Sequence, residues 1–138
     1  MFLYDMGKVV EIGITDTKGS RINKVSEVEA FKGKGLLNDR KFKENNHKKS
    51  QITLIEIENI DHFNKISNTN IPAIDFRRNI ITENIRLNEL VGKEFFIGNV
   101  KLKAHDLCRP CKYLQEKLKL DNFIKEFLHT GGIRCEIL

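Results

Sequence analysis

The chain has 138 residues, with 24 lysines and arginines against 19 aspartates and glutamates, which gives a net charge of +5. This length suits one domain, residues 1–138, whose core needs no disulfide bonds. No apolar run approaches the roughly 20 residues that span a membrane, and no basic helix or zinc finger indicates a nucleic-acid partner. Three cysteines and no recognisable signal peptide predict a cytoplasmic protein. Residues 1–7 could be disordered.

The first half of the chain predicts strands and one helix. Apolar residues dominate residues 9–14, and an imperfect alternation follows in residues 21–31, which predicts two strands, the second with a bulge. Residues 51–55 form a short apolar run that leads into a helical stripe at residues 56–66. Residues 74–82 predict another strand, interrupted by two arginines.

A basic loop connects the second and third predicted strands. Residues 32–49 carry seven lysines and arginines and two acidic residues, so the loop is either a solvated surface or a site for a phosphate or carboxylate. Gly33, Gly35 and Asn38 tolerate positive φ, and the N–H groups of such a loop could face an anion.

The second half contains the clearest hairpin signal. Residues 94–97 and 100–104 alternate in hydrophobicity on either side of a Gly-Asn pair, which suits a two-residue turn. Short helices are predicted up to residue 118 and over residues 121–129, and a final strand over residues 133–138. Strands dominate, which predicts a mainly β domain, an antiparallel β-barrel with a few short helices.

Chemistry is expected at Cys108-Arg109-Pro110-Cys111-Lys112, which lies between a predicted strand and a predicted helix. The partial positive charge of a helix N-terminus and the two flanking cations favour thiolates, which attack electrophiles and bind metals. Three functions remain open for these cysteines: a zinc site completed by His105, His129 or Cys135, a thioredoxin-like dithiol, or one reactive thiolate that carries sulfur or ligates a metal. Cys135 itself is expected to be a core residue.

Two adjacent arginines mark the predicted strand at residues 74–82. In an alternating strand either Arg77 or Arg78 points inwards, where it must pair with a carboxylate or serve an anion. Asn79 is then expected to be the polar neighbour that caps a turn.

These motifs occur in an order that resembles the MOSC family, named for the C-terminal domain of molybdenum cofactor sulfurases. The motifs are Gly33-x-Gly35-Leu36-x-Asn38-Asp39-Arg40, Gln51-Ile52-Thr53-Leu54-Ile55, Arg77-Arg78-Asn79-Ile80-Ile81-Thr82, Leu90-Val91-Gly92 with Phe96-Ile97-Gly98, Cys108-x-Pro110-Cys111, and Gly131-Gly132-Ile133-Arg134. The resemblance covers the chain from about Lys8 to Leu138 and is strongest to small stand-alone bacterial members.

The resemblance implies a β-barrel with a site for the molybdenum cofactor, molybdopterin, or its sulfur. Cys111 matches the family's reactive cysteine, which carries a persulfide or ligates molybdenum, and Cys108 matches an additional thiol found in some relatives. The residues expected to bind the cofactor are Gly33, Gly35, Asp39, Arg40, Arg78, Asn79 and Arg109. Expected partners are proteins of cofactor biosynthesis or molybdoenzymes.

The resemblance leaves several functions open: cofactor binding or sulfur transfer, a molybdenum-dependent reduction of N-hydroxylated compounds with a separate electron donor, and a cofactor carrier without turnover. Outside the family, the chain could be a basic anion-binding module with structural cysteines. The family loop usually reads Gly-Asp-Arg-His, whereas Lys41 follows Arg40 here. Relatives also continue beyond Gly-Gly-x-Arg with a further hairpin strand; its absence predicts an open barrel edge that could form a homodimer or accept a partner strand.

Overall fold

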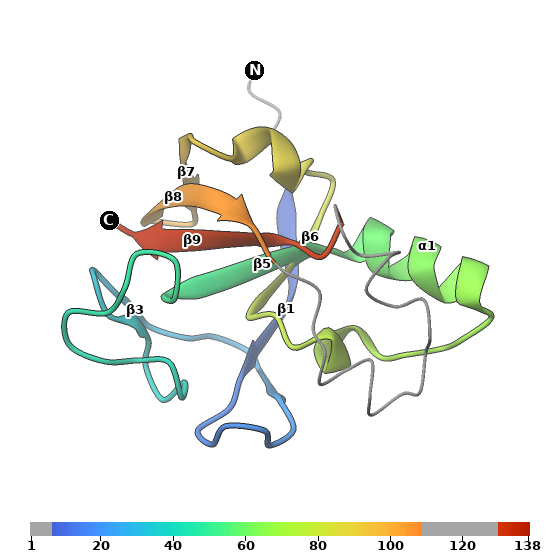
Figure 1. Cartoon of the computed structure of the whole chain (residues 1–138), viewed down its shortest axis with the longest axis horizontal. Helices are drawn as coiled ribbons and strands as arrows, with labels where there is room; N and C mark the ends of the chain where they lie inside the picture. The colour runs from blue at the N-terminus through green and yellow to red at the C-terminus, as the bar shows by residue number, and fades with distance from the viewer. Residues whose placement is uncertain (1–6, 109–129) are drawn as a thin grey trace.

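The computed structural model describes residues 7–108 and 130–138, and its main feature is a curled sheet that forms a half-barrel (Figure 1). The strands are β1 (Lys8–Ile14), β2 (Asn23–Val25), β3 (Ala30–Phe31), β4 (Gly35–Leu36), β5 (Ile52–Glu56), β6 (Ile80–Glu83), β7 (Glu94–Ile97), β8 (Val100–Leu107) and β9 (Ile133–Ile137). The helices are α1 (Ile57–Ser67) and two short 3-10 helices, η2 (Ala73–Phe76) and η3 (Leu87–Leu90). The prediction of a mainly β, barrel-like domain with few helices is confirmed.

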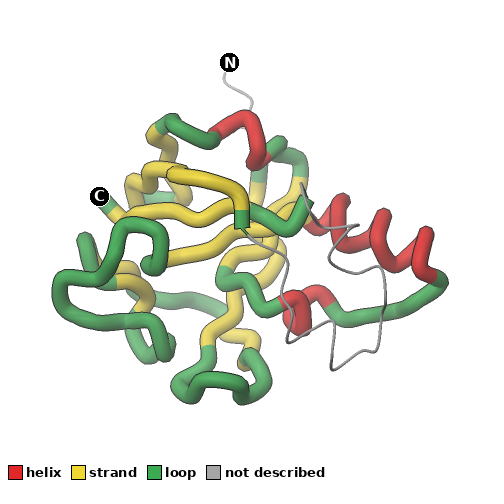
Figure 2. Tube along the Cα trace, viewed as in Figure 1, coloured by secondary structure: helices red, strands yellow, loops and turns green. Residues whose placement is uncertain are grey.

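The large sheet has the strand order β2-β1-β6-β5-β9-β8-β7, and β3 pairs with β4 in a separate hairpin. Most neighbours run antiparallel, but β5 and β6 are parallel. Parallel neighbours need a crossover connection, and here the crossover contains α1, which lies at one end of the sheet (Figure 2). The topology thus places β9, from the far end of the sequence, between β5 and β8.

The sheet buries apolar side chains on both faces. Leu54 and Ile80 belong to the cluster that fills the half-barrel, whereas their sequence neighbours Ile55 and Ile81 pack on the opposite face with Phe63 of α1. Successive side chains of a strand point to opposite faces. This is why β5 and β6 read as continuous apolar runs rather than alternating ones.

Three predicted elements are confirmed in outline. The helix occupies Ile57–Ser67 and ends at Asn68, which adopts the left-handed conformation at its C-cap. The hairpin of β7 and β8 turns at Gly98, whose φ is 58°. The final strand is β9. The helices predicted within residues 113–129 lie outside the described residues.

Two predicted strands need correction. Residues 21–31 form two short strands, β2 and β3, which belong to different sheets. Residues 74–82 do not form one strand, because η2 occupies their first part and β6 begins only at Ile80. Arg77 adopts the left-handed conformation with a φ of 64°, which ends η2. The argument from strand alternation at Arg77 and Arg78 was therefore wrong.

Candidate functional site

Cys108 lies directly after β8 and is the only predicted site residue of the cysteine motif among the described residues. Its side chain is buried, and its N–H donates to the carbonyl oxygen of Gly132 at 2.8 Å. This bond joins the end of β8 to the turn before β9. Cys111 and Arg109 lie outside the described residues, so the predicted roles of both stay predictions.

Cations from three distant segments interact electrostatically with the thiol of Cys108. Arg78, Lys41 and Arg134 lower its pKa, whereas the nearby Asp106 carboxylate raises it. Arg78 precedes β6, and its Nε donates to the carbonyl oxygen of Gly131 at 2.8 Å. The fold therefore brings together Cys108 and Arg78, two residues predicted for the site, with Lys41 and Arg134, for which no site role was predicted. We call Lys41, Arg78, Cys108 and Arg134 the thiol cluster.

Burial, rather than charge, dominates the ionisation of Cys108. Loss of hydration raises the pKa of its thiol, and the nearby cations Arg78 and Lys41 only partly oppose this effect. The expectation of a favoured thiolate is therefore wrong for Cys108. Cys135 is fully buried in the half-barrel core, and burial raises its pKa as well. Its prediction as a core residue is confirmed.

Lys41 is a half-buried cation, and the only carboxylate of the described residues that acts on its pKa is that of Asp39, which is not within ion-pair distance. Burial lowers the pKa of its ammonium group, and repulsion from Arg40 and Arg78 acts in the same direction. Within the described ranges Lys41 forms no ion pair. A partly desolvated charge is costly unless it is paired. The position therefore favours an anionic ligand, which would compensate both burial and repulsion.

Two residues predicted to bind the cofactor use their side chains to hold the scaffold. Asp39 is buried, and its Oδ1 accepts the N–H of Thr15 at 3.1 Å. Asn79 is also buried; its Oδ1 accepts the N–H of Thr53 at 3.1 Å, and its Nδ2 donates to the carbonyl oxygen of Gly13 at 3.0 Å. Asn79 thus fixes the segment that carries Arg78 against β1 and β5.

The glycine loop forms the β3–β4 hairpin. The N–H of Gly33 donates to the carbonyl oxygen of Ile137 at 3.1 Å, and that of Lys34 to the carbonyl oxygen of Phe31 at 3.0 Å. These two donors are thus engaged by carbonyl groups and do not face an anion.

Asp106 organises a second group of charges beside the thiol cluster. Its carboxylate accepts two hydrogen bonds from Arg134, at 2.8 and 2.5 Å, and lies 3.2 Å from Nζ of Lys49. The hydrogen-bonded Arg134 guanidinium, with help from Lys49, holds the pKa of Asp106 below its ordinary value. Arg134 is therefore largely neutralised by a carboxylate, whereas Lys41 forms no ion pair among the described residues. Sequence reasoning missed Asp106, because no pattern links it to Arg134.

The network at Asp106 predicts a loss of stability in acid. The folded pKa lies below the unfolded value of about 3.9, so the pair stabilises the fold above that pH and is lost as the pH falls through the folded pKa. We expect Asp106→Asn to cost about 1 kcal/mol at pH 7, because the pair is partly exposed. Urea unfolding of the parent and of Asp106→Asn at pH 7 and pH 3 measures the loss in free energy of unfolding. An equal loss at both pH values would contradict the prediction.

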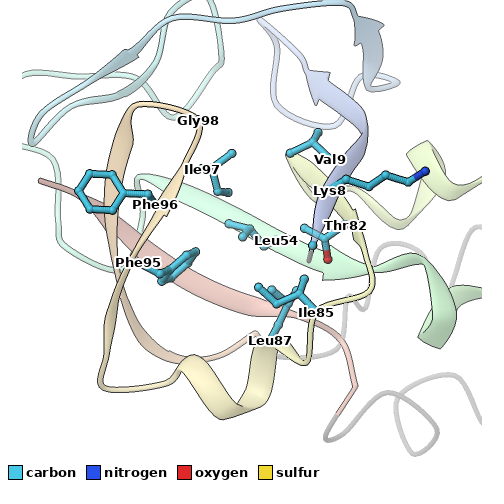
Figure 3. A pocket seen from close by; sticks show the side chains of 11 residues that line it. Lys8, Val9, Leu54, Thr82, Ile85, Leu87, Phe95, Phe96, Ile97 and Gly98 are labelled. Atoms are coloured by element: carbon cyan, nitrogen blue, oxygen red, sulfur yellow. The ribbon is translucent and has the colours of Figure 1, made fainter. Parts of the chain in front are cut away.

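The hollow in Figure 3 lies elsewhere on the molecule. It has a volume of about 210 Å³ and is lined by residues of β1, β5, η3 and β7, among them Val9, Leu54, Leu87 and Phe95. No predicted site residue lines it. Within residues 7–108 and 130–138, no three His, Cys, Asp or Glu side chains are placed to hold a metal, and no helix is long and apolar enough to cross a membrane.

Comparison with known proteins places this arrangement in a family. The MOSC domain model matches residues 39–137. Among solved structures, the YuaD protein from Bacillus subtilis has a TM-score of 0.78 at 17% identity, with 96% of this chain and 88% of that chain covered. YiiM from Geobacillus stearothermophilus has a TM-score of 0.75 at 16% identity, with 96% and 68% covered. YiiM from Escherichia coli has a TM-score of 0.69 at 14% identity, with 95% and 62% covered.

No curated protein matches the sequence. At these identities the solved structures support the fold alone, whereas the family model spans most of the chain, including Asp39, Arg78, Cys108, Cys111 and Arg134. The resemblance inferred from the motifs is thus confirmed, and the chain belongs to the MOSC domain family.

Proposed function

We propose that this chain binds the molybdenum cofactor at the thiol cluster, with Cys111 as metal ligand or sulfur carrier. The MOSC family is associated with binding of this cofactor and with sulfurase-like or reductase roles. The observation that carries the proposal is Lys41, a half-buried ammonium group that forms no ion pair with any carboxylate of the described residues and that interacts electrostatically with Arg78 and the thiol of Cys108.

The donor set fits the cofactor's chemistry. A phosphate tail suits the fork of an arginine guanidinium and the point charge of a lysine ammonium. Cys108 supplies a protected thiol in the same place, and Cys111 follows three residues later in the sequence. When bound, the cofactor would supply metal and sulfur chemistry. Lys41 and Arg78 would hold its anionic part, and the buried position of Cys108 would keep water from the thiol.

Two activities are compatible with this site. As a sulfur carrier, the Cys111 thiolate would take the outer sulfur from a persulfide of a cofactor-biosynthesis protein. A nucleophilic acceptor would then take that sulfur from Cys111 and release the Cys111 thiolate. As a reductase of N-hydroxylated compounds, the chain would need a separate electron-donor protein. The Lys41 observation supports anion binding in both, so cofactor binding is the proposal and the choice of activity is a matter for experiment.

The test uses protein purified from a molybdenum-replete host. Bound pterin is measured by fluorescence, bound molybdenum by metal analysis, and any sulfur adduct by intact mass. We expect Lys41→Met and Arg78→Met to lower bound pterin about tenfold or more, since each removes a charge that no other described side chain replaces. Lys32→Met is the matched control, because Lys32 is an exposed lysine of the same basic loop. Cys111→Ser should lose molybdenum or a sulfur adduct.

The outcomes separate the alternatives. A sulfur adduct on Cys111 without metal supports sulfur transfer, and pterin retained in Cys111→Ser supports a carrier. Parent protein that contains no pterin, metal or sulfur adduct, even after incubation with the cofactor, contradicts the proposal. The basic loop would then be a site for some other anion.

A further inference from the structure

Asn46 connects the separate parts of the basic loop. Its side chain is buried, and its Nδ2 lies 2.7 Å from the carbonyl oxygen of Lys41, 2.8 Å from that of Lys34 and 3.3 Å from that of Ser50. Its backbone N–H donates to the carbonyl oxygen of Gly33 at 3.0 Å. One side chain therefore joins the glycine loop, the segment of Lys41 and the start of β5.

Gln51 fastens this connection to the central sheet. Its Nε2 donates to the carbonyl oxygen of Asn46 at 3.2 Å, and its Oε1 accepts the N–H of Ile137 at 2.8 Å. Gln51 is fully buried. The path from Lys41 through Asn46 and Gln51 thus ends on β9, the strand that also carries Arg134 of the thiol cluster.

We infer that Asn46 is a positioning residue of the thiol cluster: it fixes the backbone of Lys41 and so holds the Lys41 ammonium group beside Arg78 and Cys108. The inference rests on the proposed function, since it concerns how that site holds its anion. A lysine side chain has four rotatable bonds, and ordering it costs entropy. Fixing the backbone lowers the entropy that remains to be lost when an anion binds.

The geometry explains why this residue is an asparagine. An amide nitrogen provides two N–H donors, which match the two short contacts to Lys41 and Lys34. Aspartate has no such donors, and serine has one. Loss of the amide leaves carbonyl groups without their donor in a partly buried loop, and the loop would rearrange to regain hydrogen bonds.

Asn64 provides a matched control in a different part of the fold. It lies near the end of α1, where its Nδ2 donates to the carbonyl oxygen of Ile71 and its Oδ1 accepts the N–H of Ile71, both at 3.0 Å. Like Asn46, it ties a loop together by its side-chain amide. Asn64→Ala should therefore lower stability in a similar way without affecting the thiol cluster.

The experiment is a double-mutant cycle on the full chain, with inorganic pyrophosphate as the probe and calorimetric titration as the measurement. We expect Lys41→Met to weaken binding about tenfold and Asn46→Ala to weaken it roughly threefold to tenfold. Asn46→Ala should have no further effect in the Lys41→Met background. Asn64→Ala should bind as the parent does, although both asparagine variants lower the melting temperature.

The possible failures are distinguishable. Unchanged binding by Lys41→Met overturns the anion site and with it the proposed function. If Lys41→Met weakens binding but Asn46→Ala binds as the parent does, only the positioning role is overturned. The same holds if Asn46→Ala weakens binding equally in the parent and in the Lys41→Met background. If Asn46→Ala does not fold, Asn46→Ser replaces it in the cycle, because serine keeps one donor for the Lys41 or Lys34 carbonyl.

Discussion

Gly132→Ala should destabilise the protein by about 3 kcal/mol or more, a large share of the stability of an ordinary domain. Gly132 has a φ of 104°, and a Cβ atom built there would lie 2.1 Å from the backbone oxygen of Leu54. That oxygen belongs to β5, a central strand that cannot withdraw without disturbing its own pairing with β9 and β6. Urea unfolding followed by circular dichroism measures the cost.

Gly19→Ala separates the two causes of this effect. Gly19 also has a positive φ, 81°, but apart from its chain neighbours no atom of the described residues lies within 4 Å of a Cβ built there. Gly19→Ala should therefore lower the stability only by the cost of placing alanine at positive φ, about 1–2 kcal/mol. Equal costs for both variants would show that the backbone at Gly132 moves away freely, and the close approach to β5 would then carry no energetic weight.

Asn79→Ala is expected to have the second large effect, about 2–4 kcal/mol. The substitution leaves the buried N–H of Thr53 and the carbonyl oxygen of Gly13 without their partner, and each unsatisfied buried group costs about 1–3 kcal/mol. It also loosens the segment directly after Arg78. We therefore expect weaker anion binding in Asn79→Ala even at temperatures where the variant is folded.

A double-mutant cycle with Thr53→Val tests the contact itself. The hydroxyl of Thr53 donates to Oδ1 of Asn79 at 3.2 Å and accepts its backbone N–H at 3.0 Å. Residues in one hydrogen-bond network are coupled by about 0.5–3 kcal/mol. Additive costs in thermal unfolding of the single and double variants would contradict the hydrogen-bonded role of Asn79.

The elements that sequence predicts well are those whose signals are local. The Gly98-Asn99 turn between alternating strands and the apolar stripe of α1 each lie within a dozen residues, and both were found. The error at residues 74–82 arose because Phe76 and Ile80 suggested one apolar run. The turn that separates them depends on Arg77 in a left-handed conformation. Arginine rarely adopts positive φ, so its presence does not predict a turn.

The site was predictable in part for the same reason. Cys108 and Arg78 stand out locally, as a cysteine pair and an arginine pair, and the structure brings them together. Asp106 acts through a partner 28 residues away and Asn46 through partners 4 to 12 residues away, and no sequence motif reveals those bonds. The elevated pKa of Cys108 was missed because burial depends on the whole fold rather than on flanking charges.

The place of β9 in the sheet has a consequence for synthesis in the cell. β5 and the β7–β8 hairpin are each paired to β9, and the pairs that join β5 to β9 link residues about eighty positions apart (Figure 1). Until Ile133–Ile137 has left the ribosome, the hairpin has no strand that connects it to β5. The emerging chain must therefore remain incompletely folded, with the apolar residues of β5 and β8 available to chaperones, until translation has passed β9.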